Sequence, residues 1–384
     1  MKVIRTFHPV GQGAFYTERF YKAGKEKASH YIVYDCGTSW GTITKAQKVV
    51  KQAFDKDDVI DYLFISHLDY DHISLAVTLK NSVNRINNIV LPLVARDEIM
   101  IGIGLNRIAN HEDAVSFLEM IRNPQGNNSF GSDTRIEFVG EPEDNTKNNP
   151  QTWKNGESRS FVNIPEWVLI PHNVKSQSRR QELIDALDAV VKEVPFQEEI
   201  YKRGLPAVGS GQALFESLKE ENFVNAIIGV KKIRYAIKSA YEKVAGGVNE
   251  NSLLLYSGPA ETKTRYQIWP VLPTVLCNWF FRRVACLYTG DSNFDIKEWK
   301  DKLYIGVWEN VGTIQLPHHG SLKSFDMTNN PLEREYVFPV SCGSVNSYGH
   351  PSSKVLSYLA VNYGQPIIVT EMSNSVYIQM IEKI

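Results

Sequence analysis

The sequence of 384 residues predicts an α/β fold, and two observations support this class. Short apolar runs alternate along the chain with glycine-containing turns and with segments of helical spacing. Several of these apolar runs end directly in histidine or aspartate, so side chains that can bind metals follow predicted strands. Hydrophobic residues make up 43% of the chain, which is ample for a core, and we expect one domain over residues 1–384.

The first half of this domain, residues 1–175, is predicted to alternate strands with helices. Its turn at 11–13, Gly-Gln-Gly, permits a close backbone approach, although a plain hairpin turn explains it as well. Residues 141–160 are rich in Asn, Asp, Glu, Gly and Pro and predict a surface loop or hairpin. Strands are expected at 2–7, 31–37, 61–65, 86–93, 136–139 and 165–171, and helices at 42–54, 73–79 and 107–122.

Helical spacing continues from about 177 to 244, and we interpret this segment as a helical insertion. Its basic stretch at 231–235, with Lys238 and Lys243, could contact phosphates, although a solvated helix face is the simpler interpretation. The second half, residues 246–384, returns to strand character. Strands are expected at 249–256, 284–291, 313–316, 336–343, 366–370 and 376–380, with a helix at 353–361.

Composition limits the class of protein. The formal net charge of -1 gives no basic signature of an obligate nucleic-acid binder and leaves a local basic groove open. The start of the chain lacks the apolar core of a secretory signal, and no stretch reaches the roughly 18 apolar residues of a membrane span. The cysteines lack CxxC spacing, so we expect reduced thiols in a cytoplasmic protein that does not contact the membrane. They are Cys36, Cys277, Cys286 and Cys342.

The segment 66–72, Ser-His-Leu-Asp-Tyr-Asp-His, is the centre of the predicted site. It places two imidazoles and two carboxylates directly after an apolar strand, and such ligands must converge within about 2.0–2.2 Å of a cation. His67 and Asp69 alternate in the chain and can share one cation, while Asp71 and His72 can turn toward a second. A polar loop facing solvent is the alternative, which the motifs further along the chain disfavour.

Three later strand ends supply more candidates. The carboxylate of Asp291 could bridge two cations about 3.5–4 Å apart. Neighbouring side chains diverge, so we expect only one of His318 and His319 to coordinate. We choose His318 and assign His319 to the substrate or to positioning a ligand. His350 is expected in the site as a general acid or phosphate donor, and a capping role ahead of the next helix is the alternative.

The distribution of histidine supports this clustering. Of the nine histidines, five lie just past predicted strand ends: His67, His72, His318, His319 and His350. Among the other four, His172 is the only candidate for an extra ligand, and a surface histidine in a loop before the insertion is the alternative interpretation.

These motifs resemble the metallo-β-lactamase superfamily and, more narrowly, the soluble hydrolase domain of the ComEC type, found in DNA-uptake proteins. The resemblance is carried by HLDYDH at 67–72, TGD at 289–291, PHHGS at 317–321 and GHP at 349–351. Asp69 stands where the usual HxHxDH motif has its second histidine, as in that branch. Gly11-Gln12-Gly13, Asp35-Cys36-Gly37 and Asn251-Ser252 also fit the pattern, and the match leaves out 141–160 and 177–244.

The resemblance implies a four-layer αβ/βα sandwich with a helical insertion, and metals at one edge between the two sheets. It also implies two divalent cations and hydrolysis of a phosphodiester by a metal-activated water, with nucleic acid as the best substrate class. Asp69 replaces an imidazole by a harder oxygen ligand, so Mn²⁺ can compete with Zn²⁺ for the site. The candidate ligands are His67, Asp69, Asp71, His72, Asp291 and His318, and the candidate catalytic residues are Asp71, His319 and His350.

Two departures and two rival functions accompany this hypothesis. No histidine between 73 and 285 clearly matches the superfamily's third motif, and the chain lacks the membrane channel of competence proteins, so DNA import is not implied.

One rival is a hydrolase of small esters, lactones, thioesters or phosphoesters. The other is a non-enzymatic module with a degenerate site that binds a protein partner through the helical insertion. Near-neutral charge counts against the nuclease, and the intact ligand set counts against the module.

Overall fold

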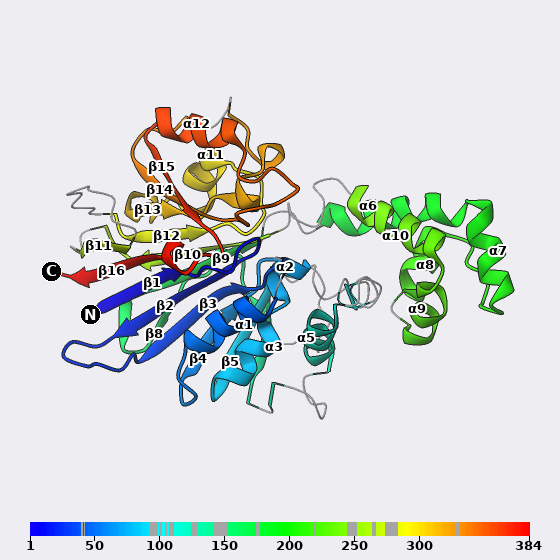
Figure 1. Cartoon of the computed structure of the whole chain (residues 1–384), viewed down its shortest axis with the longest axis horizontal. Helices are drawn as coiled ribbons and strands as arrows, with labels where there is room; N and C mark the ends of the chain where they lie inside the picture. The colour runs from blue at the N-terminus through cyan, green and yellow to red at the C-terminus, as the bar shows by residue number, and fades with distance from the viewer. Residues whose placement is uncertain are drawn as a thin grey trace.

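Two mixed β-sheets form the body of the protein in a computed structural model of the chain (Figure 1). The described residues are 1–39, 41, 43–92, 99, 102–103, 106, 111–123, 130–131, 133–140, 152–173, 177–218, 220–243, 252–262, 266–272, 283–327 and 331–384. The strands of the first sheet are β1 (Lys2–Phe7), β2 (Phe15–Tyr21), β3 (His30–Cys36), β4 (Val59–Phe64), β5 (Arg85–Pro92), β6 (Arg135–Val139), β7 (Thr152–Trp153), β11 (Tyr266–Leu272) and β16 (Tyr377–Lys383). Those of the second are β8 (Arg159–Phe161), β9 (Ile164–Asn173), β10 (Leu253–Pro259), β12 (Ala285–Tyr288), β13 (Val311–Ile314), β14 (Tyr336–Ser341) and β15 (Gly364–Val369).

The two sheets share one pattern of pairing. Their strand orders are β11-β16-β1-β2-β3-β4-β5-β6-β7 and β15-β14-β13-β12-β10-β9-β8. Each sheet is antiparallel at one side and turns parallel at the other, from β3 onward in the first and from β12 onward in the second. Parallel strands end at the same edge of a sheet, so the loops that follow β3, β4, β12, β13 and β14 can meet there.

Helices cover the outer face of each sheet and complete four layers. The helices are α1 (Ile43–Gln52), α2 (Tyr70–Ile73), α3 (Ala76–Ser82), α5 (Glu112–Arg122), α6 (Gln177–Val191), α7 (Val194–Lys202), α8 (Gly211–Ser217), α9 (Glu221–Ile228), α10 (Lys231–Lys243), α11 (Ile296–Glu298) and α12 (Ser353–Val361). α1, α3 and α5 lie on the first sheet, and α11 and α12 lie on the second (Figure 1). The four-layer αβ/βα sandwich expected from the sequence is therefore confirmed.

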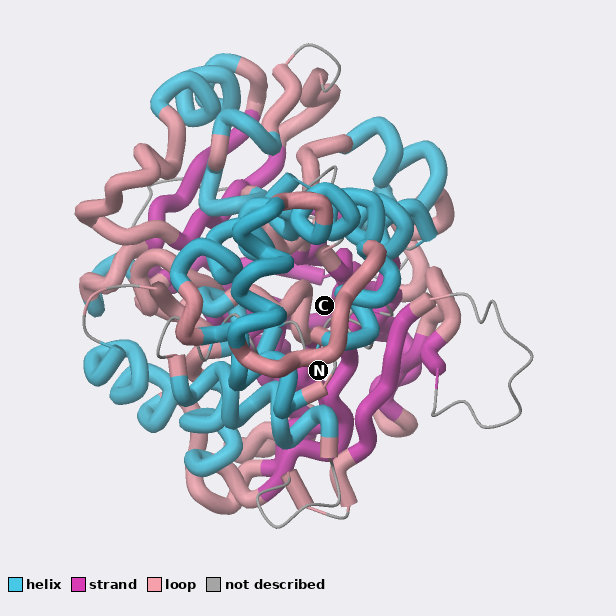
Figure 2. Tube along the Cα trace, turned by 90° about the vertical axis from the view of Figure 1, so that its right-hand side faces the viewer, coloured by secondary structure: helices cyan, strands magenta, loops and turns pink. Residues whose placement is uncertain are grey.

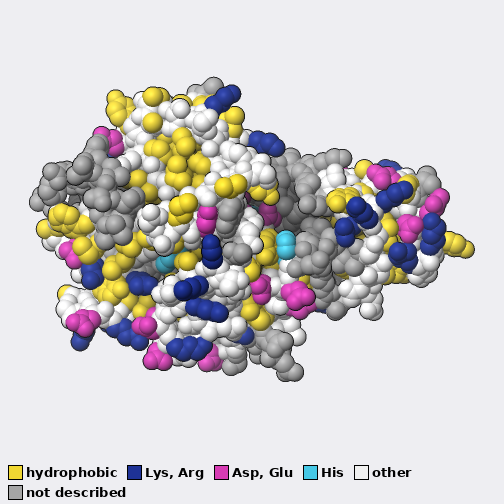
Figure 3. Space-filling model, in the orientation of Figure 1, with side chains coloured by type: hydrophobic (Ala, Val, Ile, Leu, Met, Phe, Trp, Pro, Cys, Tyr) yellow, Lys and Arg dark blue, Asp and Glu magenta, His cyan; other side chains and the backbone are white. Residues whose placement is uncertain are grey.

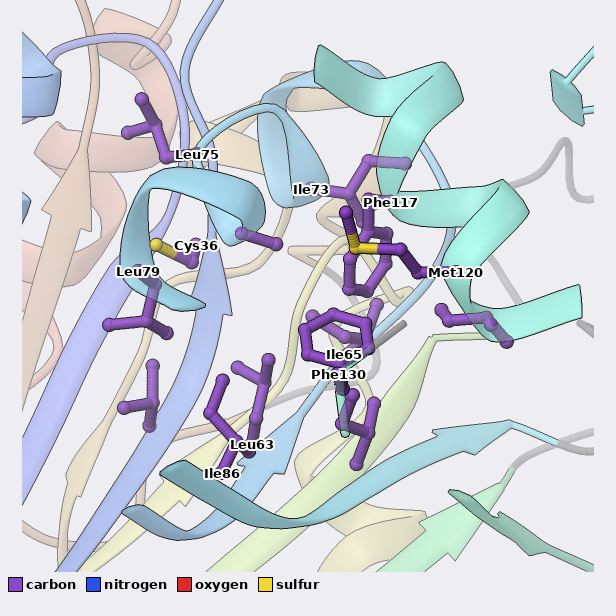
Figure 4. Packing of buried hydrophobic residues seen from close by; sticks show 14 of the residues in the cluster. Cys36, Leu63, Ile65, Ile73, Leu75, Leu79, Ile86, Phe117, Met120 and Phe130 are labelled. Atoms are coloured by element: carbon purple, nitrogen blue, oxygen red, sulfur yellow. The ribbon is translucent and has the colours of Figure 1, made fainter. Parts of the chain in front are cut away.

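Three hydrophobic clusters hold these layers together. The first joins α1, α3 and α5 to the outer face of their sheet, and Figure 4 shows Leu79 and Phe117 from these helices over Leu63 of β4. The second fills the space between the sheets, with Trp153 and Trp167 both fully buried in it. The third packs α11 and α12 on the second sheet. Burial on both faces explains why the parallel strands are near-continuous apolar runs.

A buried polar network also crosses between the sheets. Arg5 of β1 donates from Nε to Glu18 of β2 at 2.6 Å and from Nη1 to the Val284 carbonyl at 3.0 Å. Glu18 accepts hydrogen bonds from the Ser257 hydroxyl at 2.6 Å and the Tyr288 hydroxyl at 3.0 Å. Both charged side chains are fully buried. A buried charge is tolerated when it is paired and hydrogen-bonded, as here.

The insertion region contains five helices, α6 to α10, with a hydrophobic cluster of their own. They project from one end of the sandwich, and the view along that end shows helices in front of the strands (Figures 1 and 2). The chain leaves β9 at Asn173 and returns at Leu253 of β10, and these two residues are register partners in adjacent antiparallel strands. Topologically, the helices therefore replace the turn of a β-hairpin. None of the described helices has both the length and the apolar character needed to cross a membrane.

Most predicted elements are present within a few residues of their expected bounds, and the differences have physical causes. β2 was not predicted, because Glu18 and Arg19 interrupt its apolar pattern, and β11 contains Pro270. The predicted helix at 73–79 is divided into α2 and α3, where the Leu75 amide bonds to the Cys36 carbonyl. Residues 107–110 and 141–151, together with Cys277, fall outside the described part of the chain. Cys36, Cys286 and Cys342 are buried free thiols.

Candidate metal centre

The loop after β4 places two imidazoles side by side in the protein interior. The rings of His67 and His72 lie 4.0 Å apart between centroids, and both residues are buried. His67 Nδ1 lies 2.9 Å from the Ser66 hydroxyl, and His72 Nδ1 lies 2.8 Å from Asp35 Oδ2. These contacts occupy the Nδ1 atoms, so each ring presents Nε2 to the space beside Asp291.

Asp291, which follows β12, stands between histidines of both halves of the chain. Its Oδ1 is 3.2 Å from His72 Nε2, and its Oδ2 is 3.8 Å from both His67 Nε2 and His318 Nε2. The Asp291 amide donates to the Ser252 hydroxyl at 2.9 Å, which fixes the turn. The two carboxylate oxygens thus face two different sets of ring nitrogens, as a bridging carboxylate requires.

The described donors form two groups that could each hold a metal ion. The donor atoms of each group lie within 4.8 Å of one another. His67, His72 and Asp291 make up the first group, and Asp71, His72 and His319 make up the second. His72 is shared, so the groups are adjacent.

Two predicted ligands lie at the edge of this cluster. Asp69 Oδ2 is 3.7 Å from His67 Nε2, and its side chain is 36% exposed. His318 is 25% exposed and its Nδ1 contacts the Ser324 hydroxyl at 2.8 Å. Both side chains are therefore adjacent to the first group and more accessible than its members.

His319 lies deeper than its neighbour. Its Nδ1 is 2.8 Å from the Ser341 carbonyl oxygen, and its Nε2 is 3.1 Å from Asp71 Oδ2. The preceding strand ends in a turn where His318 and His319 both adopt positive φ, and this sends the two rings apart to a centroid distance of 6.5 Å. The expected divergence of the pair is present, and it is His319 that joins the carboxylate and imidazole of α2.

Glycines permit the backbone packing that positions Asp71. A Cβ on Gly37 would lie 2.5 Å from the Asp71 carbonyl oxygen, and one on Gly13 would lie 2.8 Å from the same atom. The Ala14 amide donates to that oxygen at 3.1 Å. The Gly-Gln-Gly turn is therefore part of the support of the centre, because any side chain at Gly13 or Gly37 would displace Asp71.

Asp35 contacts the candidate centre, although the sequence reasoning gave it no role there. It is fully buried at the end of β3, with φ of 55°, and accepts hydrogen bonds from the Ser66 amide at 2.6 Å and the Ser66 hydroxyl at 2.7 Å. Its contact with His72 Nδ1 orients that ring. A carboxylate at the end of an apolar strand was the available signal, and a carboxylate at a strand end also identified Asp291.

The electrostatics of the cluster differ from ring to ring. Burial and the neighbouring His72 lower the pKa of His67 to about 3, which keeps this imidazole neutral. Burial opposes protonation of His72 as well, but Asp291, Asp35 and Asp71 together raise its pKa well above the usual value. Asp35 lies 2.8 Å from Nδ1 of this ring and Asp291 lies 3.2 Å from its Nε2, so carboxylates flank both ring nitrogens.

His350 lies beside this cluster. Its ring centroid is 5.6 Å from that of His318 and 6.5 Å from that of His319. Asn346 fixes the loop by donating to the His350 carbonyl at 2.7 Å and accepting from the His350 amide at 3.0 Å. His350 thus faces the candidate ligands across a short gap.

His172, the other candidate, lies elsewhere. It is on β9 opposite Leu254, whose side chain packs on the outer face of the second sheet, and its ring meets Tyr304 edge-on at 4.8 Å. It belongs to neither group of described donors. The structure also places it in a strand rather than in a surface loop.

The donor set fits divalent cations. His67 Nε2 is buried and has no hydrogen-bond partner among the described residues. A neutral imidazole nitrogen of this kind can coordinate a metal ion. The opposite ring nitrogen is oriented by Ser66, as the ligating histidines of metal sites require. Figure 3 shows an exposed histidine side chain on the part of the sandwich nearest the insertion helices.

Comparison with known proteins agrees with this geometry. No curated protein sequence matches the chain. The model of one protein family matches residues 26–84, which span β3, α1, β4 and the 66–72 loop. Over these residues the chain is similar to the metallo-beta-lactamase superfamily, whose members are typically metal-dependent hydrolases.

Proposed function

We propose that the chain is a metal-dependent phosphodiesterase that cleaves nucleic acid. The observation that carries this proposal is the position of Asp291, whose two oxygens face His72 on one side and His67 and His318 on the other. This arrangement suits two neighbouring cations. Two divalent cations with Asp69, Asp71 and Asp291 would leave a net positive centre, which favours an anionic substrate.

The two cations would be held by ligands from both halves of the chain. His67, Asp69 and His318 would surround the first beside Asp291 Oδ2, and Asp71 and His72 would hold the second beside Asp291 Oδ1. Zn²⁺ and Mn²⁺ both suit this mixture of imidazoles and carboxylates. When bound, such cations polarise a phosphoryl oxygen and make water more acidic, so that it attacks at neutral pH.

Other residues of the chain would orient the histidine rings and supply a proton. Asp35 would hold the His72 ring, and the Ser341 carbonyl would hold that of His319, so that its Nε2 stays on Asp71. His350, opposite His318, would donate a proton to the leaving oxygen or a hydrogen bond to a phosphate oxygen. The motifs at 67–72, 317–321 and 349–351 favour the ComEC-type branch, which supports nucleic acid as the substrate class.

The insertion helices would shape access to the centre rather than its chemistry. They extend from the end of the sandwich that carries α2 (Figure 1). On α10, Lys231, Lys232 and Tyr235 are exposed, so this helix offers a surface to a nucleic acid or to a protein partner. The side chains of Lys238 and Lys243 fall outside the described part of the chain.

Metal loading combined with a substrate panel tests the proposal. The protein is stripped with EDTA, reloaded with Zn²⁺ or Mn²⁺, and analysed for metal by mass spectrometry. Its activity is then measured on single- and double-stranded DNA, RNA, a lactone, a thioester and a small phosphoester. We expect two equivalents of metal and hydrolysis of a nucleic acid that EDTA abolishes. Hydrolysis of only the lactone, thioester or small phosphoester would assign the protein to the rival class, and no hydrolysis with no bound metal would favour the binding module.

A further inference from the structure

An exposed aromatic side chain projects next to the candidate centre. Tyr348 lies in the loop after β14 and is 68% exposed. The loops that carry His318 and His350 form the rim of the centre, and each has an exposed apolar side chain: Leu322 is 39% exposed and Val345 is 74% exposed. Exposed apolar groups that gather beside a polar centre indicate a binding surface.

The loop that presents Tyr348 is fixed by hydrogen bonds. Asn346 donates to the carbonyls of Gly343 and His350 at 3.0 and 2.7 Å and accepts from the His350 amide. The Ser344 amide donates to Glu371 at 3.0 Å, so the start of the loop is also tied to the chain beyond β15. Tyr348 is therefore held in place without being buried, which lowers the entropic cost of binding a partner to it.

The ring of Tyr348 continues a row of rings that leads out of the centre. It stacks on His350 with a centroid distance of 5.8 Å and an interplanar angle of 27°. His350 in turn lies 5.6 Å from His318, whose Nε2 faces Asp291. A group that stacks on the free surface of Tyr348 would thus lie a short way from the cations.

We propose that Tyr348 is a stacking platform for a nucleobase next to the scissile phosphodiester. This inference rests on the proposed function, and it makes single-stranded nucleic acid with exposed bases the substrate class. A phosphate at the cations would place the adjacent base near the rim, where an aromatic ring offers a partner that accepts every base.

The test measures binding and cleavage separately on the full chain. Fluorescence anisotropy in EDTA gives the Kd of a labelled single-stranded oligothymidylate and of an abasic oligomer of the same length. Tyr348→Ala should weaken binding of the oligothymidylate about tenfold and leave the abasic oligomer unchanged, while Tyr348→Phe retains wild-type binding. With metal restored, Tyr348→Ala should raise KM for the oligothymidylate more than it lowers kcat.

Tyr363→Ala is the matched control. Tyr363 is 67% exposed, yet it precedes β15 at the end opposite to Ser341, whose carbonyl holds His319. The Tyr363→Ala variant should bind the oligothymidylate and the abasic oligomer as wild type does.

Three results would overturn the inference: no change with Tyr348→Ala, an equal loss for both oligomers, or the same loss with Tyr363→Ala. If a phosphodiester is still hydrolysed in any of these cases, the proposed function stands without the platform. Binding in EDTA needs no turnover, so base-dependent binding through Tyr348 in a protein that hydrolyses no phosphodiester would support the platform and reject the activity.

Discussion

At the scale of single residues, Asp71 and Asp291 each contact a histidine that comes from the other half of the chain. We expect Asp71→Ala and Asp291→Ala to abolish hydrolysis and reduce bound metal, because both carboxylates lie in loops beyond strand ends. The fold should persist, as measured by circular dichroism and thermal unfolding.

Asp57→Ala serves as the control for these variants. Asp57 is exposed and precedes β4 at the end opposite to the 66–72 loop, so it should keep turnover and metal content. Wild-type turnover with full metal content in either active-site variant would contradict the two-metal proposal.

His350 has a different expected role. We expect His350→Ala to lower kcat about 10²–10⁴-fold, which is typical of a positioned acid–base group, with metal stoichiometry unchanged. His30→Ala is a suitable control, because His30 begins β3 at the end away from Asp35. Loss of one metal equivalent would make His350 a ligand, and normal turnover would leave it only a capping role.

His172 gives the stability of the protein a pH dependence that is separate from the centre. Burial lowers its pKa in the folded protein to about 4, whereas an unfolded chain protonates it near 6.5. The unfolded state therefore binds the proton first as pH falls, and stability is lost between about pH 6.5 and 4.

Denaturant unfolding of wild type and His172→Gln at several pH values measures this effect. Between pH 7 and pH 4, the free energy of unfolding of wild type should fall by up to about 3 kcal/mol more than that of His172→Gln. A difference that stays constant with pH would contradict it.

The local motifs identified most of the candidate site, and the reason is physical. His67 and Asp291 lie two or three residues beyond apolar strands, and His72 follows in the same loop as His67, so their position at one sheet edge follows from strand order. The support of the site was not predictable, since Ser252 contacts the Asp291 amide and the Ser341 carbonyl contacts His319 through tertiary structure alone. Which of His318 and His319 approaches Asp71 depends on two positive φ angles that spacing does not encode.

At the scale of elements, the hairpin geometry of β9 and β10 makes the insertion removable. Asn173 and Leu253 face each other in register, so a short linker can replace residues 177–244 while Ser252 is kept. We expect the shortened protein to fold and bind metal but to show an altered preference among DNA, RNA and small esters. Metal analysis and the substrate panel measure both properties.

Retention of metal is the decisive result for that variant. If deletion removes metal, a ligand lies within the removed segment, and the insertion would be part of the centre. An unchanged substrate preference would mean that these helices do not shape access.

Elements were predictable where the local pattern of apolar residues is uninterrupted. The bounds of β1 and α12, for example, match the expectation. β2 was not, because its charged residue Glu18 has its partner on another strand. A buried charge interrupts the apolar pattern by which strands are predicted, and only the paired structure shows why it is tolerated.

At the scale of the whole molecule, the Arg5–Glu18 pair of the first sheet connects the two sheets, because Glu18 accepts hydrogen bonds from Ser257 and Tyr288 of the second sheet. Arg5→Leu would leave the Glu18 carboxylate buried and uncompensated, so we expect a loss of about 3–5 kcal/mol in the free energy of unfolding. The double variant Arg5→Leu/Glu18→Leu should recover much of it, since it removes both charges. Chemical denaturation checks both, and equal stability of the single and double variants would contradict the buried-charge argument.

β1 lies between β2 and β16, and Lys2 pairs with Glu382. During synthesis, β1 and β2 leave the ribosome long before β16 exists, so the edge of the first sheet at β1 stays open until β16 is translated. Contacts between such distant segments slow folding. The nascent chain would then expose strand edges that aggregate readily.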